Sequence, residues 1–500
     1  MLRPFLHPAR FLLPGLLVVV MLVQACTSDS TELSGTPPDP HFELTLGAAT
    51  ISLSQGSAAS TSVKAIRSGG LISPITYTIS GAPTGLAASV ATTSVADSAT
   101  LTVTASATLA AGSYQIVLSA TAPDAPAQQV SIAVTVSALA GGTQMTRSVV
   151  AGAHTCALTT ASVAYCWGYN ADGQLGNNDT SIVNPTPIKV GGGLLFAALF
   201  VSKVEGVTCG VTPPGTAYCW GDNDDGQLGD GTRTQRMTPT PVAGGLMFKS
   251  FAVGTVHTCG VTIDGTAYCW GFSSAGAFGD GFTGSRPMPA IAAPGMTFDT
   301  IVAGQDFTCG LTQLQGAYCW GRGTDGQLGN GTATNSTTPV AVSGGLTFSS
   351  LVAGGFSVCG LTTGGKAYCW GADFFGTLGD GSSATEDGVT RRVTPVEVAG
   401  GFTFRSLSAG YQTVCGVIDS GAGYCWGYNN GAVGDGTLDH RSRPTPVAGG
   451  LTFQSIGVGT GQTCGVTTTG ALYCWGANSN GELGDGTVAP HSVPAPVRWP

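Results

Sequence analysis

The sequence predicts an all-β protein with two folded units: an N-terminal β-sandwich and a C-terminal region of sevenfold repeats. The first observation is composition. Charged residues make up 9% of the 500 residues while glycine numbers 77, which favours short strands and tight turns over helices. The second is a run of short alternating segments between residues 41 and 138. The third is a set of seven cysteine pairs, each separated by ten positions, within residues 145–500.

Residues 1–25 are predicted to be a lipoprotein signal peptide and to lie outside the fold. Arg3 and Arg10 supply positive charge, and the apolar run over residues 11–23 is too short to span a bilayer as a helix. The segment Val23-Gln24-Ala25-Cys26 resembles a bacterial lipobox, in which the cysteine becomes diacylated. We therefore expect an exported protein that is lipid-anchored through Cys26 to a bacterial outer membrane or cell surface. The alternative is an ordinary secretory signal followed by a chance cysteine.

Residues 26–40 are rich in Ser, Thr, Gly and Pro and are predicted to be a flexible tether. Residues 41–138 contain seven short segments with period-two or β-branched character, separated by turn signals, and residues 139–144 form a linker. Seven strands in about a hundred residues predict an immunoglobulin-like β-sandwich. The predicted strands are residues 44–46, 51–53, 63–66, 75–79, 101–103, 114–118 and 130–136.

The region from residue 145 to residue 500 repeats seven times. The first cysteines of successive pairs are spaced 53, 50, 50, 50, 56 and 49 residues apart. A period near fifty predicts a propeller or a solenoid. Each unit contains Tyr-Cys-Trp-Gly, then a glycine-rich loop, then a strand that contains proline.

These motifs resemble the repeat of the regulator of chromosome condensation family. They are Tyr-x-Trp-Gly, Gly-Gln-Leu-Gly as at residues 226–229, Pro-x-Pro-Val and Ala-Gly-x-x-His-Thr. The resemblance covers residues 145–500 and implies a seven-bladed β-propeller of four-stranded blades. It also implies two alternative activities: guanine-nucleotide exchange, as in the family's best-known eukaryotic member, or inhibition of a secreted enzyme, as in a similar bacterial propeller that inhibits β-lactamase.

The paired cysteines are predicted to form one disulfide in each repeat. Two cysteines ten positions apart on the strands of a hairpin fall directly opposite each other, within disulfide range. Such bonds suit an exported protein. Zinc binding is the main alternative, but the histidines do not repeat with the cysteines; free or inter-blade thiols are the other. The predicted pairs are Cys156–Cys166, Cys209–Cys219, Cys259–Cys269, Cys309–Cys319, Cys359–Cys369, Cys415–Cys425 and Cys464–Cys474.

The tryptophan that follows each second cysteine points to the opposite face of its strand, so we expect it to pack between blades. Because the repeats open on residues 146–150 and stop after residues 494–498, we expect one blade to be stitched from both chain ends. The Gly-Gln-Leu-Gly segments are predicted to be tight turns, since a phosphate loop would need a lysine and a following helix. The run at residues 222–226 is the alternative candidate for a calcium loop.

The composition argues against nucleic acid as a partner, because the formal net charge is −9 and no basic cluster reverses it. No serine elbow, phosphate loop or zinc signature stands out, so we predict a non-catalytic monomer without cofactor or metal. The predicted role is to bind a protein or surface polymer. The candidate contacts are Phe374 and Phe375, just before an insertion at residues 381–392, and Arg391 and Arg392 at the end of that insertion. The alternative is a solvated loop with packed aromatic side chains.

Overall fold

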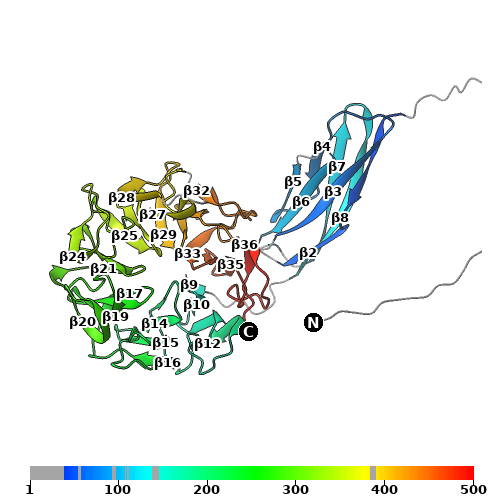
Figure 1. Ribbon diagram of the computed structural model, residues 1–500. Helices are drawn as coiled ribbons and strands as arrows, with labels where there is room; N and C mark the ends of the chain where they lie inside the picture. Colours follow the sequence, from blue (N-terminus) through cyan, green and yellow to red (C-terminus); the bar gives the residue numbers. More distant parts are fainter. Residues whose placement is uncertain are drawn as a thin grey trace, which may run out of the picture.

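The computed structural model describes residues 39–54, 58–92, 97–106, 109, 112–137, 146–382 and 390–500. It consists of a sandwich of strands β1 to β8 and a ring of strands β9 to β36 (Figure 1). The predicted signal peptide with Cys26, most of the tether, the linker and residues 383–389 of the insertion lie outside the described residues. Within the described residues, no helix has the length and hydrophobicity needed to cross a bilayer.

The sandwich has two four-stranded sheets, ordered β1-β3-β6-β5 and β2-β8-β7-β4. If the strands are lettered in chain order, with β2 as a short A′ strand, these sheets are ABED and A′GFC. That is the immunoglobulin topology, and it confirms the predicted sandwich. The strand β2 runs parallel to β8, and the other pairs are antiparallel. The strands are β1 His41–Leu46, β2 Thr50–Ser54, β3 Ala58–Ser68, β4 Thr76–Ser80, β5 Leu86–Thr92, β6 Ser98–Ala105, β7 Gly112–Ala122 and β8 Ala125–Ser137.

One sandwich strand was not predicted from the sequence. Strand β5 is a run of Leu, Ala, Ser, Val and Thr, and alanine and serine carry little strand signal. It forms because every residue from Leu86 to Thr92 pairs with β6. The core between the sheets is built from alternating apolar residues such as Val63, Leu101, Ile116 and Ile132, all fully buried.

The ring has seven blades, and each blade is an antiparallel sheet of four consecutive strands, which confirms the seven-bladed architecture. Blade 1 is β9 Thr146–Ala151, β10 His154–Thr159, β11 Ala164–Tyr169 and β12 Val183–Lys189. Blade 2 is β13 Ala198–Val201, β14 Val207–Val211, β15 Ala217–Gly221 and β16 Arg236–Pro241. Blade 3 is β17 Phe248–Val253, β18 His257–Thr262, β19 Thr266–Ser273 and β20 Gly284–Thr297. Blade 4 is β21 Thr300–Ala303, β22 Phe307–Leu311, β23 Ala317–Gly321 and β24 Ser336–Ala341.

The remaining three blades follow the same plan. Blade 5 is β25 Phe348–Ala353, β26 Ser357–Thr362, β27 Ala367–Asp373 and β28 Thr390–Glu397, with a 3-10 turn, η1 Phe374–Gly376, after β27. Blade 6 is β29 Phe404–Ala409, β30 Thr413–Ile418, β31 Gly423–Gly427 and β32 Arg441–Pro446. Blade 7 is β33 Phe453–Val458, β34 Gln462–Thr467, β35 Leu472–Gly476 and β36 His491–Pro496. Every outermost strand contains proline, which cannot donate to a neighbouring strand and so protects the exposed edges of the sheets.

All seven cysteine pairs form disulfides between the second and third strands of their blade. Cys259 and Cys269, for example, stand directly opposite each other in the register, with Cα atoms 4.1 Å apart. Closing a loop of this length stabilises an isolated hairpin by at most about 3 kcal/mol in the chain-entropy model. Seven disulfides indicate that the protein folds in an oxidising compartment.

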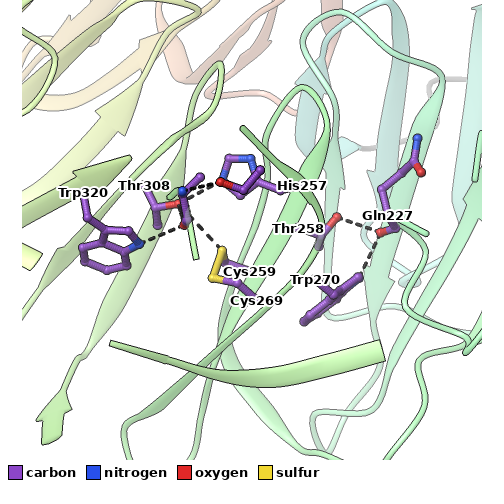
Figure 2. The surroundings of a disulfide bond; sticks show 10 residues. Gln227, His257, Thr258, Cys259, Cys269, Trp270, Thr308 and Trp320 are labelled. Carbon is purple, nitrogen blue, oxygen red and sulfur yellow. Dashed lines mark hydrogen bonds between the residues drawn. A yellow bond between two sulfur atoms is a disulfide. The ribbon is translucent and has the colours of Figure 1, made fainter. Parts of the chain in front are cut away.

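The layer between two blades combines the disulfide of one blade with the tryptophan of the next. Trp270 packs on the side of blade 3 that faces blade 2, close to Cys209 and Cys219, and the Cys259–Cys269 disulfide faces blade 4 and Trp320. Figure 2 shows these opposite directions: Trp270 reaches Gln227, whereas the disulfide lies toward Thr308. The seven repeated tryptophans are fully buried, which confirms the predicted inter-blade packing.

Each repeated tryptophan also makes a hydrogen bond that the sequence did not predict. Its indole Nε1 donates to a main-chain carbonyl in the glycine-rich loop of the preceding blade, at 2.8 to 3.0 Å. In blade 3 the Gln227 carbonyl accepts from both Trp270 Nε1 and Thr258 Oγ1, each at 2.9 Å. Buried donors are costly when unpaired, so this carbonyl fixes the tryptophan and the loop together.

The predicted stitched blade is wrong. Val149 lies in β9 of blade 1 and Val497 follows β36 of blade 7, so the chain holds a whole number of blades. The ring closes instead by the same contacts that join its other blades: both valines belong to one buried cluster, and Trp167 Nε1 donates to the Glu482 carbonyl at 2.8 Å. Trp499 adds edge-to-face contacts with Tyr165 and Trp167, with ring centroids 5.3 and 6.3 Å apart.

Candidate binding face

One face of the propeller carries the longest loops of the blades, and their residues vary around the ring. We call loop face the side that carries the turn between the first and second strands, and the long loop between the third and fourth strands, of every blade. The position after each Trp-Gly opens the long loop, and its residue type changes around the ring. Variation on a repeated scaffold marks this side as the candidate recognition face. The seven residues at that position are Tyr169, Asp222, Phe272, Arg322, Ala372, Tyr428 and Ala477.

In four blades a buried asparagine shapes the long loop: Asn170, Asn223, Asn429 and Asn478. Asn223 Oδ1 accepts from the Leu228 main-chain N–H at 3.0 Å, and its amide group donates to the carbonyls of Thr232 and Thr234. Asn429 plays the same part in blade 6, where it accepts from Val433 N–H at 3.1 Å. Asn223 therefore has a structural role within the polar run at residues 222–226, which the sequence left open as a calcium loop.

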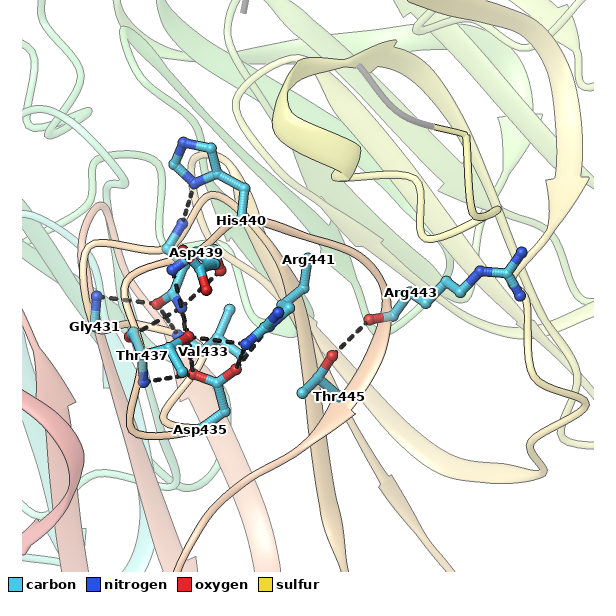
Figure 3. A network of polar contacts seen from close by, with 10 residues as sticks. Gly431, Val433, Asp435, Thr437, Asp439, His440, Arg441, Arg443 and Thr445 are labelled. Atoms are coloured by element: carbon cyan, nitrogen blue, oxygen red, sulfur yellow. Dashed lines mark hydrogen bonds and ion pairs between the residues drawn. The ribbon is translucent and has the colours of Figure 1, made fainter. Parts of the chain in front are cut away.

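A second repeated brace closes these loops. Asp435 binds the Arg441 guanidinium at 2.6 Å and accepts from Thr437, as Figure 3 shows. Burial alone would raise the pKa of Asp435, but the hydrogen bonds from Thr437 and Arg441 outweigh it and hold that pKa below its usual value. The equivalent pairs are Asp230–Arg236, Asp280–Arg286, Asp380–Arg392 and Asp485–His491. Arg392, a predicted contact residue, therefore braces its own blade.

Blade 5 carries two phenylalanines at positions where no other blade has an aromatic residue. Phe374 and Phe375 occupy the positions of Thr324 and Asp325 in blade 4. Both rings are half-buried, and Phe375 adopts a left-handed backbone conformation with φ of 56°. Bulky residues rarely tolerate that region, and such strain concentrates at functional sites.

Phe374 and Phe375 belong to a larger group of rings on the loop face of blades 5 and 6, which we call the aromatic arc. It has two parts, each held by ring contacts. Phe356 packs against Phe374 and Tyr411, both with centroids 5.4 Å apart. Phe375 packs against Tyr428 at 5.1 Å and against His440 at 4.5 Å. The aromatic arc is thus Phe356, Phe374, Phe375, Tyr411, Tyr428 and His440.

The predicted contact residues therefore fall on one surface, but not all of them are free to serve it. Arg391 is exposed and donates to the Thr324 carbonyl at 3.0 Å, which ties it to the loop of blade 4. Sequence reasoning missed Phe356, Tyr411 and Tyr428. The signal for Tyr428 was its place directly after Trp-Gly, and the signal for the other two was their place in the turn between the first and second strands.

The opposite arc of the loop face is acidic. Asp172 of blade 1 lies near three carboxylates of blade 2: Glu205, Asp222 and Asp225. Gln227 Nε2 donates to Asp222 Oδ2 at 2.7 Å. Burial, followed by the charges of Asp222 and Asp225, raises the pKa of Glu205 to about 7. The loop face is therefore polarised, with carboxylates on one side and aromatic rings on the other.

The central channel is a separate cavity of about 300 Å³, lined mainly by apolar residues of the innermost strands. Lys203 reaches across it, and Nζ donates to the Val458 carbonyl at 3.0 Å and the Ala151 carbonyl at 3.4 Å. Burial lowers the pKa of Lys203 to about 8. Because these carbonyls belong to blades 7 and 1, Lys203 joins the first and last blades from its position on blade 2.

Two family models, both describing the same repeat, match segments of the propeller. The regulator of chromosome condensation (RCC1) repeat matches residues 163–212, 214–261, 316–361 and 469–500, and its second form matches residues 248–277, 298–327, 348–377 and 453–482. The E3 ubiquitin-protein ligase HERC2 of Homo sapiens is 35% identical over 105 residues, which are 20% of this chain and 2% of HERC2. The ultraviolet-B receptor UVR8 of Arabidopsis thaliana is 33% identical over 122 residues, which are 22% of this chain and 26% of UVR8.

Solved structures show the same fold at low sequence identity. Human WBSCR16 superposes with a TM-score of 0.60 at 20% identity, covering 67% of this chain and 94% of WBSCR16. Prp20p of Saccharomyces cerevisiae, whose structure was described together with its binding to Gsp1p and histones, has a TM-score of 0.60 at 20% identity, covering 68% of this chain and 87% of Prp20p. The matched segments therefore carry the regulator of chromosome condensation repeat, and the chain folds into a seven-bladed propeller.

Proposed function

We propose that this protein is a non-catalytic, exported lipoprotein, anchored through Cys26, whose propeller binds a protein or surface polymer through its aromatic arc. The observation that carries the binding role is the placement of Phe374 and Phe375 at positions where no other blade has an aromatic residue. Six ring side chains from blades 5 and 6 gather there, while the scaffold beneath them repeats. Aromatic residues are enriched at the energetic centres of binding surfaces.

The oxidising compartment supports the exported part of the proposal. Fourteen cysteines are paired in the described residues, which leaves Cys26 as the odd cysteine of the chain. A diacylated cysteine at the start of the mature chain would hold the sandwich and propeller at a membrane surface. The sandwich between anchor and propeller would then act as a spacer.

The anchor is tested by replacing Cys26 with serine. The wild-type protein is expected to fractionate with membranes and to carry a diacylglyceryl mass on Cys26. The Cys26→Ser variant is expected to lose that mass and to move to the soluble exported fraction, because no thioether can form. Membrane fractionation and mass spectrometry of the N-terminal peptide measure both. A wild-type protein that is soluble and unmodified would contradict the anchor and leave the binding role untouched.

The binding role is tested by giving blade 5 the residues of blade 4. In the Phe374→Thr, Phe375→Asp variant these positions match Thr324 and Asp325, so the loop keeps a sequence that already folds in this ring. Full-length protein is immobilised and exposed to surface extracts and spent medium of the producing organism. We expect one retained partner, with affinity at least tenfold weaker for the double variant, because the aromatic arc loses two rings.

The matched control removes an exposed apolar residue from the opposite face. Leu314 is 89% exposed in the turn between β22 and β23, so Leu314→Gln should leave binding unchanged. A partner held equally by all three proteins would place binding elsewhere on the molecule and overturn the role of the aromatic arc.

A further inference from the structure

A cleft of about 490 Å³ opens on the loop face between blades 3 and 4, and it joins the aromatic arc. Arg322 lines the cleft and lies over the Phe356 ring, with Cζ 5.4 Å from the centroid. Gln305 also lines the cleft, and its Oε1 accepts from the Tyr411 hydroxyl at 3.2 Å. The cleft and the aromatic arc therefore form one continuous surface. The volume of the cleft falls in the range of pockets that bind small ligands.

The two charged side chains in the cleft are opposite in sign and held in place. Asp306 is 8% exposed and has a left-handed φ of 57°; its carboxylate accepts from Ser274 N–H at 3.1 Å and Ser273 Oγ at 3.2 Å. Arg322 donates to Asp325 at 3.0 Å and to Thr324 Oγ1 at 3.2 Å. The cleft is therefore polar and rigid without a net charge of either sign.

Amide groups supply the remaining polar contacts, beside an aromatic ring. Asn335 Oδ1 accepts from Gly323 N–H at 3.0 Å, which fixes its side chain as the Tyr411 bond fixes Gln305. The NH₂ groups of both amides have no partner within the described residues, so each can donate to a ligand oxygen. The half-buried Phe272 ring lines the same cleft.

The geometry points to a neutral oligosaccharide, a segment of a surface polysaccharide, as the ligand of this cleft. A sugar ring has hydroxyl groups at its edge and an apolar C–H face. The hydroxyls match the amides of Gln305 and Asn335 and the fixed groups of Asp306 and Arg322, because each hydroxyl can both donate and accept. The C–H face matches the ring of Phe272, the one aromatic side chain that lines the cleft. This inference rests on the proposed binding function and specifies its ligand.

Other ligand classes fit the same residues less well. A nucleic acid needs several cations along its backbone, and the cleft offers one guanidinium that is already paired with Asp325. A protein partner would be expected to bury a large apolar anchor. The cleft is instead mainly polar, because seven of its ten lining residues are polar: Thr255, Ser274, Gln305, Asp306, Arg322, Thr324 and Asn335.

The test uses positions where the repeat already tolerates alanine. Phe272 and Arg322 occupy the place that is Ala372 in blade 5 and Ala477 in blade 7, so Phe272→Ala and Arg322→Ala keep a sequence that folds in this ring. Asp222→Ala changes the same place in blade 2, outside the cleft, and is the matched control. Full-length proteins are titrated calorimetrically with laminarin, mannan, cello-oligosaccharides and chitin oligosaccharides, and with heparin as a polyanion. Thermal unfolding checks that each variant is folded.

We expect at least one neutral glycan to bind, with affinity at least tenfold lower for Phe272→Ala and Arg322→Ala and within twofold of wild type for Asp222→Ala. No binding of any neutral glycan at millimolar concentration would overturn the inference. Binding of heparin alone, or binding of a neutral glycan that both cleft variants retain, would overturn it as well. If no neutral glycan binds but a protein partner depends on Phe374 and Phe375, the proposed binding function stands and the glycan inference is wrong. If neither a glycan nor such a partner binds, both the proposed function and the glycan inference are wrong.

Discussion

Replacing Gly229 by alanine is expected to destabilise the propeller by roughly 3–8 kcal/mol. Gly229 has a φ of +71°, and a Cβ at this position would stand 2.5 Å from Trp270 Nε1. The main chain there cannot move freely, because the neighbouring Gln227 carbonyl accepts from Trp270 and Thr258. Alanine therefore adds overpacking, about 1–3 kcal/mol, and the loss of a buried hydrogen bond, about 1–3 kcal/mol, to the strain of the left-handed backbone.

A glycine with the same backbone but no neighbour isolates the contribution of the tryptophan. Gly245 has a φ of +64°, and a Cβ there would meet nothing within 4 Å. Gly245→Ala should cost about 1–2 kcal/mol, the strain of a left-handed alanine alone. Chemical and thermal unfolding of both variants gives the comparison. Equal losses in the two would show that the tryptophan contact does not hold the blades together.

The same contact shows what the sequence could and could not predict about the fold. The ten-residue spacing put Cys259 opposite Cys269 because a hairpin register depends only on local pairing. The bond from Trp270 to Gln227 depends on how one blade sits against the previous one, and no local pattern encodes that distance. The error about ring closure has the same origin, since β9 and β36 were assigned to one sheet from their places in the chain.

The candidate site was predictable only in part. Phe374 and Phe375 lie just before the insertion at residues 381–392, so the sequence identified them. Other residues of the aromatic arc come from different blades. Phe356 and Tyr411 lie 55 positions apart, on neighbouring blades, and the packing of those blades places their ring centroids 5.4 Å apart. The cleft needs Phe272 from blade 3 and Arg322 from blade 4, each ordinary by itself. The sequence predicted Arg392 as a contact residue, whereas in the structure its guanidinium pairs with Asp380.

Acidification from pH 7 to pH 4.5 is expected to destabilise the propeller through His154 and His257. Both imidazoles lie buried between blades, where Nε2 bonds to a threonine hydroxyl of the following blade, Thr208 at 2.6 Å and Thr308 at 2.9 Å. Burial lowers the pKa of His154 to about 3 and that of His257 to about 4, the latter opposed by the charge of Asp306. In the unfolded chain the histidine pKa is near 6.5, so below that pH the unfolded state binds protons that the folded state does not bind.

The sign and size of the effect follow from proton linkage. Below pH 6.5 the unfolded state gains protons, so the free energy of unfolding falls with pH and levels off only near the folded pKa values. Two pH units below 6.5 correspond to about 2.5 kcal/mol for each histidine, or about 5 kcal/mol for the pair. Glu205 acts in the opposite direction, because its raised pKa lets the folded state take up a proton below pH 7.

A substitution already present in the ring separates the histidines from Glu205. Blade 7 carries Gln462 at this position, where Nε2 donates to the Gly152 carbonyl of the next blade at 2.9 Å. The His154→Gln, His257→Gln variant should therefore fold, and its stability should fall by about 5 kcal/mol less than that of the wild type between pH 7 and pH 4.5. Urea unfolding at both pH values measures this difference, from which Glu205 cancels because both proteins contain it. Glu205→Gln alone should instead steepen the acid loss. Parallel pH profiles for the wild type and the double variant would show that neither histidine is kept neutral in the folded ring.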